Sequence, residues 1–241
     1  MNRARLQLPD VTLVAVDTVA HALTAMAVRK CLDQVDFGAT IVFSDRRLDV
    51  PGAEWIKCGP FASIDGADHT LWYDVPQYVR TSHLLVIQWD SWIVNPALWC
   101  DEYLRYDYIG APWWWHRDGM NVGNGGFSLR SARLARLLVQ QRQTMPCGSP
   151  EDDALCRRYR RELERHGICF APDLLAACFS SERSWPPFVS FGFHGMFNWP
   201  RVLSSAEIEA RLAVAPPYVL TSLHCAQMRE LMRAEKAGAA A

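Results

Sequence analysis

The stretch His83-Leu-Leu-Val-Ile-Gln-Trp-Asp90 is the most informative part of the sequence, because it contains a continuous apolar run that is followed by a carboxylate. Short apolar runs of this kind are typical of strands buried on both faces of a parallel sheet. Further along, Val122-Gly-Asn-Gly-Gly-Phe-Ser-Leu-Arg130 places three glycines and an amide directly before a second predicted strand, Gly126 to Leu129. Glycine at such a position allows a close approach of backbone that a side chain would block.

A β-α-β pattern opens the chain. Val11 to Val16 is an unbroken apolar run that predicts a strand, Ala20 to Leu32 has a helical pattern, and Thr40 to Phe43 predicts the next strand. A third strand is predicted at Glu54 to Lys57, and Leu84 to Gln88 is the most strand-like and most central segment. The pattern predicts an α/β fold with a mostly parallel central sheet flanked by helices.

The rest of the chain predicts shorter elements. Ser131 can cap a helix in which Leu134, Leu137 and Leu138 share a face, and Pro150 begins a helix that runs to about Arg165. We also expect a helix or turn over Trp72 to Arg80, a short helix around Ala97 to Leu104, a loop at Pro112-Trp-Trp-Trp-His116, a late strand at Ile168 to Ala171, a tight loop at Phe191-Gly-Phe-His-Gly195, and helices from Ser205 interrupted at Pro216-Pro217.

The 241 residues are half hydrophobic and 21% charged, and no linker rich in Ser, Gly or Pro divides them. We therefore expect an N-terminal arm at 1–10, one α/β domain at 11–200, and a C-terminal helical extension at 201–241 that packs on it. Met228, Leu231 and Met232 have helical spacing there. This stretch can pack on the domain, join a homodimer or touch a membrane surface, and its mixed charges favour packing.

Bulk charge and motifs exclude several classes of protein. A formal net charge of -1 gives no field for holding nucleic acid. No apolar run has the length of a signal peptide or a transmembrane segment, so we expect a cytoplasmic protein, with attachment to the face of the inner membrane left open. Eight scattered cysteines without a Cys-x-x-Cys pair indicate reduced core thiols. The Walker A, complete dinucleotide-binding, His-Glu-x-x-His and Gly-x-Ser-x-Gly motifs are missing.

Asp90 and the glycine-rich segment are the first candidate site residues. Ligands of open α/β sheets collect beyond the carboxyl ends of the strands, and a divalent cation that holds a diphosphate explains a carboxylate there. The alternative is that Asp90 caps the following turn. Gly123 to Gly126 either forms a hairpin turn or makes a wall of bare backbone for a sugar ring, with the Asn124 amide bonding a hydroxyl.

Two further groups of residues can carry chemistry. Glu151, Asp152 and Asp153 begin a predicted helix, where acidic residues commonly complement the helix dipole. The functional alternative assigns Asp152, or next Glu151, as the general base for an acceptor hydroxyl. His194 lies between glycines and can complete an oxygen-rich metal site, although a single histidine is usually structural. Trp113, Trp114 and Trp115 are core residues or else stack on a sugar.

A family resemblance rests on motifs spread over most of the chain, roughly Val11 to Trp199. These motifs resemble a bacterial family described as a domain of unknown function, which is similar to glycosyltransferases of the GT-A fold. The motifs are Gln88-Trp-Asp90, Tyr106-Asp-Tyr-Ile-Gly-Ala-Pro-Trp113, Val122-Gly-Asn-Gly-Gly-Phe-Ser-Leu-Arg-Ser131, Pro150-Glu-Asp152, Phe170-Ala-Pro172, Phe179-Ser-x-Glu182 and Phe191-Gly-Phe-His-Gly195.

The resemblance implies a single GT-A-like (Rossmann-like) domain that transfers sugar from a nucleotide-diphosphate sugar donor to a glycan or glycolipid acceptor. Asp90 takes the place of the last aspartate of the Asp-x-Asp metal motif, and His194 joins it as a ligand of manganese or magnesium. Gln88 stands at the first acidic position, and this departure leaves the metal requirement open. The resemblance also places Val16, Asp17, Thr18, Ser44 and Asp45 against the nucleotide base and ribose. Gln88, Asn124, Gly125 and Gly126 complete the residues that we expect to bind the donor.

By the same resemblance, Asp152 takes the acceptor proton while the metal, or a basic group in its place, stabilises the departing diphosphate. We expect Trp113 and Trp114 to stack on the acceptor or the sugar. A second hypothesis is a degenerate GT-A domain that binds sugar or nucleotide without transfer. A nucleotidyltransferase is disfavoured, because Asp17-Thr18-Val19 is not a glycine-rich phosphate loop. Whether transfer retains or inverts the anomeric configuration stays open, since it depends on a carboxylate beneath the anomeric carbon.

Overall fold

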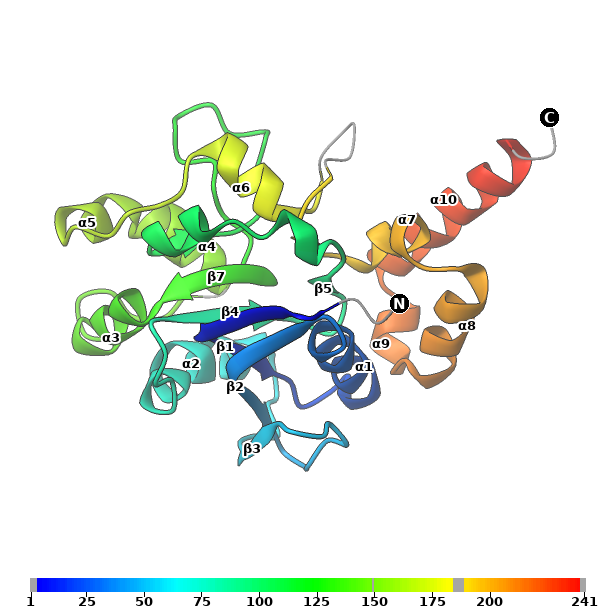
Figure 1. Cartoon of the computed structure of the whole chain (residues 1–241), viewed down its shortest axis with the longest axis horizontal. Helices are drawn as coiled ribbons and strands as arrows, with labels where there is room; N and C mark the ends of the chain where they lie inside the picture. Colours follow the sequence, from blue (N-terminus) through cyan, green and yellow to red (C-terminus); the bar gives the residue numbers. More distant parts are fainter. Residues whose placement is uncertain (1–3, 149, 184–188, 239–241) are drawn as a thin grey trace.

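The computed structural model describes residues 4–148, 150–183 and 189–238, which form a central sheet with helices around it (Figure 1). The strand order is β3-β2-β1-β4-β7-β6. Pairing is parallel from β3 to β4, and β7 runs antiparallel between β4 and β6. The predicted mostly parallel α/β fold is therefore confirmed. The strands are β1 (Leu6–Val16), β2 (Val35–Ser44), β3 (Glu54–Lys57), β4 (His83–Ile87), β6 (Tyr108–Ile109) and β7 (Phe127–Ser131).

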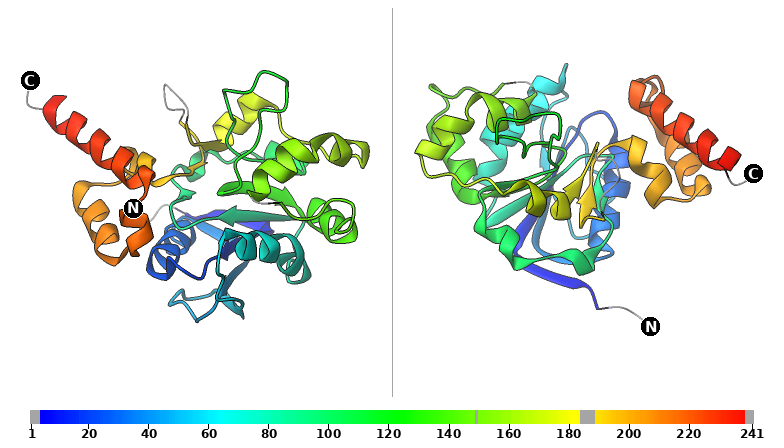
Figure 2. Two further views of the ribbon diagram at one scale, coloured as in Figure 1. Left: turned by 180° about the vertical axis from the view of Figure 1, so that it is seen from behind. Right: turned by 90° about the horizontal axis from the view of Figure 1, so that it is seen from above.

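Helical segments cover both faces of this sheet (Figure 2). Alternate residues of β1 and β4 point to opposite sides, so that Leu13 and Leu85 join the core beneath α1, whereas Val14 and Val86 join a smaller core under η1, η2 and α3. The helices are α1 (His21–Leu32), α2 (Ile64–His69), η1 (Thr70–Asp74), η2 (Val75–Gln77), η3 (Pro96–Leu98), η4 (Asp101–Arg105), α3 (Ala132–Gln140), α4 (Glu151–Asp153), η5 (Ala154–Arg158), α5 (Arg160–Arg165) and α6 (Asp173–Phe179).

A second, smaller sheet lies beside the end of β4. It has the order β5-β9-β8, with bounds β5 (Trp92–Ile93), β8 (Ser180–Ser181) and β9 (Gly192–Phe193). The tight loop predicted at Phe191 to Gly195 is therefore wrong in its middle, where β9 pairs with both neighbours. A Cβ at Gly192 would lie 2.1 Å from Cζ of Phe127, so glycine serves sheet packing here rather than a turn.

The predicted late strand at Ile168 to Ala171 is also wrong. Only Phe170 forms a bridge, to Tyr108, because β6 itself is only two residues long. The helix predicted from Pro150 to Arg165 is present as α4, η5 and α5, with Pro150 as its N-cap residue and a π-helical turn in its middle. The segment predicted as helix or turn near Trp72 is helical, as η1 and η2.

The C-terminal helices gather at one end of the sheet (Figures 1 and 2). They are η6 (Met196–Asn198), α7 (Trp199–Val202), α8 (Ser205–Val214), α9 (Pro217–Leu220) and α10 (Leu223–Gly238), and the predicted break at Pro216-Pro217 separates α8 from α9. Met228 of α10 is fully buried in the main core. In the described part of the chain, no helix combines the length and the apolar character that crossing a bilayer requires.

Two helix caps give a prediction about stability. The Ser131 hydroxyl accepts a hydrogen bond from the Leu134 N–H at the start of α3 and donates one to the buried carboxylate of Asp107. Ser204 caps α8 in a capping box with Glu207 at an exposed site. We expect Ser204→Ala to cost about 1 kcal/mol of unfolding free energy, the usual value of a cap. Ser131→Ala should cost about 2 kcal/mol or more, because the carboxylate of Asp107, which loses its donor, is buried, whereas the carboxylate of Glu207, to which Ser204 donates, is open to water.

Urea denaturation of both variants and the wild type measures this difference. Equal losses in the two variants would show that the bond to Asp107 adds nothing to the cap.

Candidate functional site

A cavity of about 450 Å³ opens where β1 and β4 end. The two strands are parallel and pair Ala15 with Ile87, so the residues that follow them, Asp17 and Gln88, meet at the same edge of the sheet. The rest of the lining comes from the segment 61–71, from Glu151 and from Tyr218 of α9. The cavity therefore lies where an α/β sheet of this kind binds its ligands.

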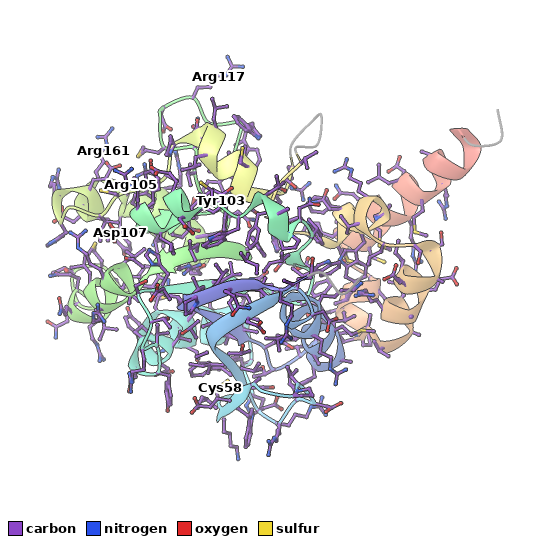
Figure 3. All side chains as sticks on the ribbon, in the orientation of Figure 1. Cys58, Tyr103, Arg105, Asp107, Arg117 and Arg161 are labelled. Atoms are coloured by element: carbon purple, nitrogen blue, oxygen red, sulfur yellow. The ribbon has the colours of Figure 1, made fainter. Side chains whose placement is uncertain are left out.

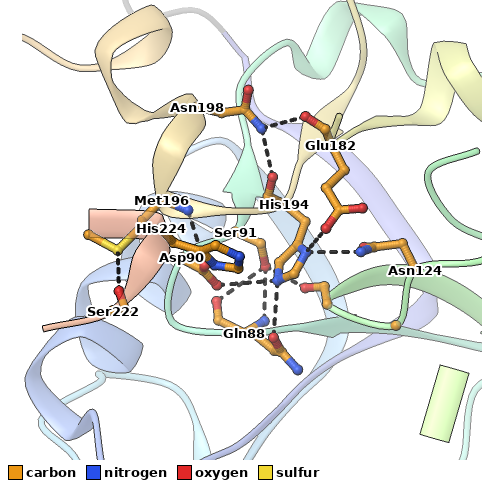
Figure 4. A network of polar contacts seen from close by, with 12 residues as sticks. Gln88, Asp90, Ser91, Asn124, Glu182, His194, Met196, Asn198, Ser222 and His224 are labelled. Carbon is orange, nitrogen blue, oxygen red and sulfur yellow. Dashed lines mark hydrogen bonds and ion pairs between the residues drawn. The ribbon is translucent and has the colours of Figure 1, made fainter. Parts of the chain in front are cut away.

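Strand register brings His194 beside Gln88 at the edge of this cavity, although Asp90, Asp152 and His194 are not among the residues that line it. β5 pairs Trp92 with Phe193, so the residues just outside that pair, Ser91 and His194, are neighbours. As a result, Nε2 of His194 lies 3.4 Å from Oδ1 of Asp90 and 3.1 Å from Oε1 of Gln88 (Figure 4). The predicted convergence of Asp90 and His194, from distant parts of the chain, is present in the structure.

Asp90 is buried, with only 4% of its surface exposed. Its Oδ2 accepts a hydrogen bond from the N–H of Met196, which begins η6. Its Oδ1 forms an ion pair with the imidazole of His194, and no hydrogen bond to this oxygen meets the usual geometric limits. A buried carboxylate oxygen needs such a positive partner, so this atom is suited to a cation.

The other nitrogen of His194, Nδ1, lies 3.3 Å from Oε1 of Glu182 and 3.0 Å from Nδ2 of Asn124. Burial by itself lowers the pKa of His194. The charges of Asp90 and Glu182 and their hydrogen bonds to the ring outweigh burial and raise this pKa to about 10. Nδ1 therefore lies beside an oxygen of Glu182, and Nε2 lies beside oxygens of Asp90 and Gln88.

The glycine-rich loop packs against the protein's own side chains. A Cβ would lie 2.4 Å from the Trp113 ring at Gly123, 2.2 Å from Glu151 Oε1 at Gly125, and 2.3 Å from the His194 ring at Gly126. These glycines thus let side chains close on the backbone, where the sequence predicted bare backbone for a sugar. Asn124 has φ of 57°, its Oδ1 is buried without a partner, and its amide meets His194.

Glu151 forms a buried ion pair with Arg130 of β7. Two guanidinium nitrogens donate to its two carboxylate oxygens at 2.6 and 2.9 Å, and the Trp72 indole N–H donates a third bond. Both side chains of the pair are less than 10% exposed. Because these donors occupy both oxygens of Glu151, it is a poorer candidate for a general base than Asp152.

Asp152 follows it on the first turn of α4. Its Oδ2 accepts the Gly125 N–H at 2.9 Å, which joins the candidate base to the glycine-rich loop. Burial, followed by the charge of Glu151, raises the pKa of Asp152, and the N–H groups of Gly125 and Asp153 oppose the rise. A carboxylate with a raised pKa is suited to accepting a proton near neutral pH.

The residues at the strand ends that we predicted to bind the sugar donor form two pairs, and the pairs lie in different places. Asp17 and Thr18 line the cavity, although Asp17 also accepts the N–H groups of Val19 and Ala20, and Thr18 accepts the N–H of Phe61. Ser44 and Asp45 do not line it. The Ser44 hydroxyl is buried without a partner, and Asp45 pairs with His21, which lowers its pKa.

The tryptophan loop lies as predicted between β6 and β7, and Arg117 projects from its outer end (Figure 3). Trp113 is 8% exposed and its ring lies against Gly123, so it is a core residue beside the site and offers no open face for stacking. Trp114 and Trp115 are 37% and 55% exposed. Of the two predicted stacking residues, only Trp114 therefore remains accessible.

The oxygen and nitrogen atoms around Asp90 meet some of the requirements of a divalent-cation site. Neighbouring ligands of an octahedral ion with bonds of about 2.1 Å lie about 3.0 Å apart, close to the separations of His194 Nε2 from Asp90 Oδ1 and Gln88 Oε1. Among the described residues, no group of three or more His, Cys, Asp or Glu side chains could hold a metal. The third protein ligand would be the Gln88 amide oxygen.

Sequence reasoning missed Phe61, Ile64, Leu71 and Tyr218 of the cavity lining, and it assigned Glu182 no role. The apolar residues carry no motif. Tyr218 comes from a helix far along the chain, and its place in the cavity lining beside Asp17 is visible only in the folded structure.

The sequence matches the family model described as Protein of unknown function (DUF5672) over residues 61–194, more than half of the chain. The chain belongs to the DUF5672 family. No curated protein matches the sequence.

This DUF5672 chain shares its fold, a GT-A fold, with a solved glycosyltransferase. A glycosyltransferase involved in the glycosylation of the major capsid of PBCV-1 aligns with a TM-score of 0.50 and 9% identity, over 85% of this chain and 98% of that one. Galactosyltransferase LgtC, in complex with donor and acceptor sugar analogs, aligns with a TM-score of 0.47 and 13% identity, over 88% and 97%. Mannosyltransferase PcManGT from Pyrobaculum calidifontis, in complex with GDP-Man and Mn2+, aligns with a TM-score of 0.44 and 10% identity, over 72% and 56%.

The buried ion pair gives a stability prediction. Glu151→Ala leaves the guanidinium of Arg130 buried without its partner, so we expect a loss of about 3–5 kcal/mol in unfolding free energy. Glu162→Ala is the control, because Glu162 pairs with the exposed Arg165 and should cost less than about 1 kcal/mol. Urea denaturation compares them, and similar losses would refute a structural role for the pair.

The raised pKa of Asp152 gives a pH prediction. Because the folded state holds this proton more tightly than the unfolded state, the stability contributed by Asp152 is complete below the ordinary pKa of 3.8 and is lost as pH rises through the raised value. Relative to Asp152→Asn, the wild type should therefore lose stability as pH rises above the ordinary pKa of 3.8. Denaturation at a series of pH values tests it, with the exposed neighbour Asp153→Asn as control. A difference that is flat with pH contradicts the prediction.

Proposed function

We propose that this protein is a nucleotide-sugar-dependent glycosyltransferase, which moves a sugar from a nucleotide-diphosphate sugar to a hydroxyl of a glycan or glycolipid. The observation that carries the proposal is the meeting of Gln88, Asp90 and His194 at the edge of the cavity beyond β1 and β4. The fold of the glycosyltransferases supports it.

The cavity suits a nucleotide in size and in character. Its volume of about 450 Å³ is within the range of small-molecule sites, and Phe61, Ile64 and Leu71 supply apolar surface for a base. Its described lining includes the carboxylates Asp17, Asp68 and Glu151 and no lysine or arginine. A diphosphate bound there needs positive charge from elsewhere, and Asp90 with His194 is where a manganese or magnesium ion would supply it.

In this proposal, Asp152 takes the proton of the acceptor hydroxyl. Its carboxylate is held by the Gly125 N–H, and its raised pKa favours proton transfer. Glu151 orders the start of α4 through Arg130. When bound, the divalent cation supplies charge that stabilises the departing nucleoside diphosphate. Trp114 is the exposed aromatic residue proposed to contact acceptor sugar.

A second candidate is a degenerate GT-A domain that binds nucleotide or sugar without transferring it. Gln88 favours this alternative, because an amide oxygen next to a single carboxylate binds a cation more weakly than two carboxylates do.

Thermal denaturation with a panel of nucleoside diphosphates, with and without Mn2+, tests the proposal. We expect one diphosphate to raise the melting temperature, more with Mn2+, and Asp90→Asn to abolish the increment due to Mn2+. If no diphosphate or nucleotide sugar shifts the melting temperature, the proposal fails.

Transfer itself is tested with the matching nucleotide sugar. Asp152→Asn should lower kcat by about 100-fold or more while the donor-induced thermal shift persists, since a general base acts on the acceptor. Asp153→Asn, an exposed neighbour, is the matched control and should keep wild-type turnover. A wild type that binds donor and shows no turnover with any acceptor favours the degenerate domain.

A further inference from the structure

Glu182 and His194 are neighbours because of strand register. β8 and β9 are parallel and pair Ser181 with Phe193, so the next residue of each strand, Glu182 and His194, leaves the small sheet at the same place. The N–H of His194 donates to the carbonyl of Ser181, which extends the ladder to the candidate ligand itself. The backbone thus places this carboxylate beside this imidazole.

A side-chain clamp then fixes the two residues together. Nδ2 of Asn198 donates to the carbonyl oxygens of both Glu182, at 2.9 Å, and His194, at 2.8 Å (Figure 4). Arg201 donates to Oδ1 of Asn198 at 2.6 Å, which sets the orientation of the amide. Asn198 is itself 4% exposed. Such a clamp limits movement of the His194 backbone relative to Glu182.

The Glu182 carboxylate faces only one nitrogen of the ring. Its Oε1 lies 3.3 Å from Nδ1, and Glu182 is 9% exposed. An ionised carboxylate only accepts hydrogen bonds, so it holds a proton on Nδ1. Nδ2 of Asn124 lies next to the same ring nitrogen, and Oδ1 of Asn124 has no hydrogen-bond partner. When the Asn124 amide is turned by 180°, its oxygen accepts a hydrogen bond from the proton on Nδ1. The opposite nitrogen, Nε2, faces Asp90 and Gln88, and because the pKa of His194 is raised to about 10, a cation that binds there displaces a proton from Nε2.

We propose that Glu182 is a positioning residue, which holds the His194 proton on Nδ1 and the ring in one orientation so that Nε2 ligates a divalent cation together with Asp90. Carboxylate–histidine–metal arrangements of this kind fix the ring and raise the basicity of the ligand nitrogen. The inference rests on the cation site of the proposed function and adds a residue to it. It explains why a second carboxylate is buried on the side of His194 away from the cavity.

The experiment measures binding of Mn2+ alone, by titration calorimetry without nucleotide. Glu182→Gln keeps the size of the side chain and removes its charge, and we expect the Kd for Mn2+ to rise by about 10- to 100-fold. Glu162→Gln is a matched control, because it removes the carboxylate of another Glu–His pair, with His166 at 3.5 Å on the surface. The control should keep the wild-type Kd.

A nitrogen-15 spectrum of the His194 ring in the Mg2+-loaded protein is the second readout. The wild type should carry its proton on Nδ1 with Nε2 unprotonated, and Glu182→Gln should lose this single tautomer. Thermal denaturation separates a folding defect from the proposed effect. A lower melting temperature with an unchanged Kd would make Glu182 merely structural and would overturn the proposal.

The remaining outcomes separate this inference from the function on which it rests. If the wild type binds Mn2+ and Glu182→Gln binds it equally well, the positioning role is refuted and the cation site stands. If the wild type binds neither Mn2+ nor Mg2+, the positioning role and the cation part of the proposed function fail together, while cation-free binding of a nucleotide remains a separate result.

Discussion

The ion pair between Arg130 and Glu151 is the constraint on which the candidate site depends. It crosses from β7 to the first turn of α4 with both side chains buried, and the Trp72 indole ties η1 to the same carboxylate. Isolated charges are unfavourable in such a place, so the two elements are held in a single relative position. Gly125 lies against Glu151, and the N–H of Gly125 holds Asp152. Misplacing Glu151 would therefore move the loop and the candidate base together.

Strand register positions the other residues of the candidate site. The antiparallel pairing of β4 with β7 sets Gly126 beside Gln88, whose N–H donates to the Gly126 carbonyl. The pairing of β5 with β9 then brings His194 against the same turn. Two sheets consequently meet at the residues between Gln88 and Trp92. Backbone pairing therefore fixes where the side chains of Gln88, Asp90 and His194 begin.

The sequence predicted those parts of the fold that have long, uniform patterns. The apolar runs of β1 and β4 and the helical pattern of α1 are visible without coordinates, and so is the cap at Ser131. Strands of two residues, such as β9, have no periodicity to recognise. The glycine-rich loop was predicted to approach something closely, but its partners are Trp113, Glu151 and His194, which only packing reveals. The meeting of Asp90 with His194 was predicted from the resemblance.

The late position of Tyr218 in the chain affects when the cavity can form during protein synthesis. One wall of the cavity, at Asp17 and Thr18, comes from an early segment of the chain, whereas Tyr218 comes from α9. A polypeptide that is still leaving the ribosome can complete its central sheet, through β7, well before α9 has been translated. The wall that Tyr218 supplies can therefore be added only after every strand of the central sheet has been translated.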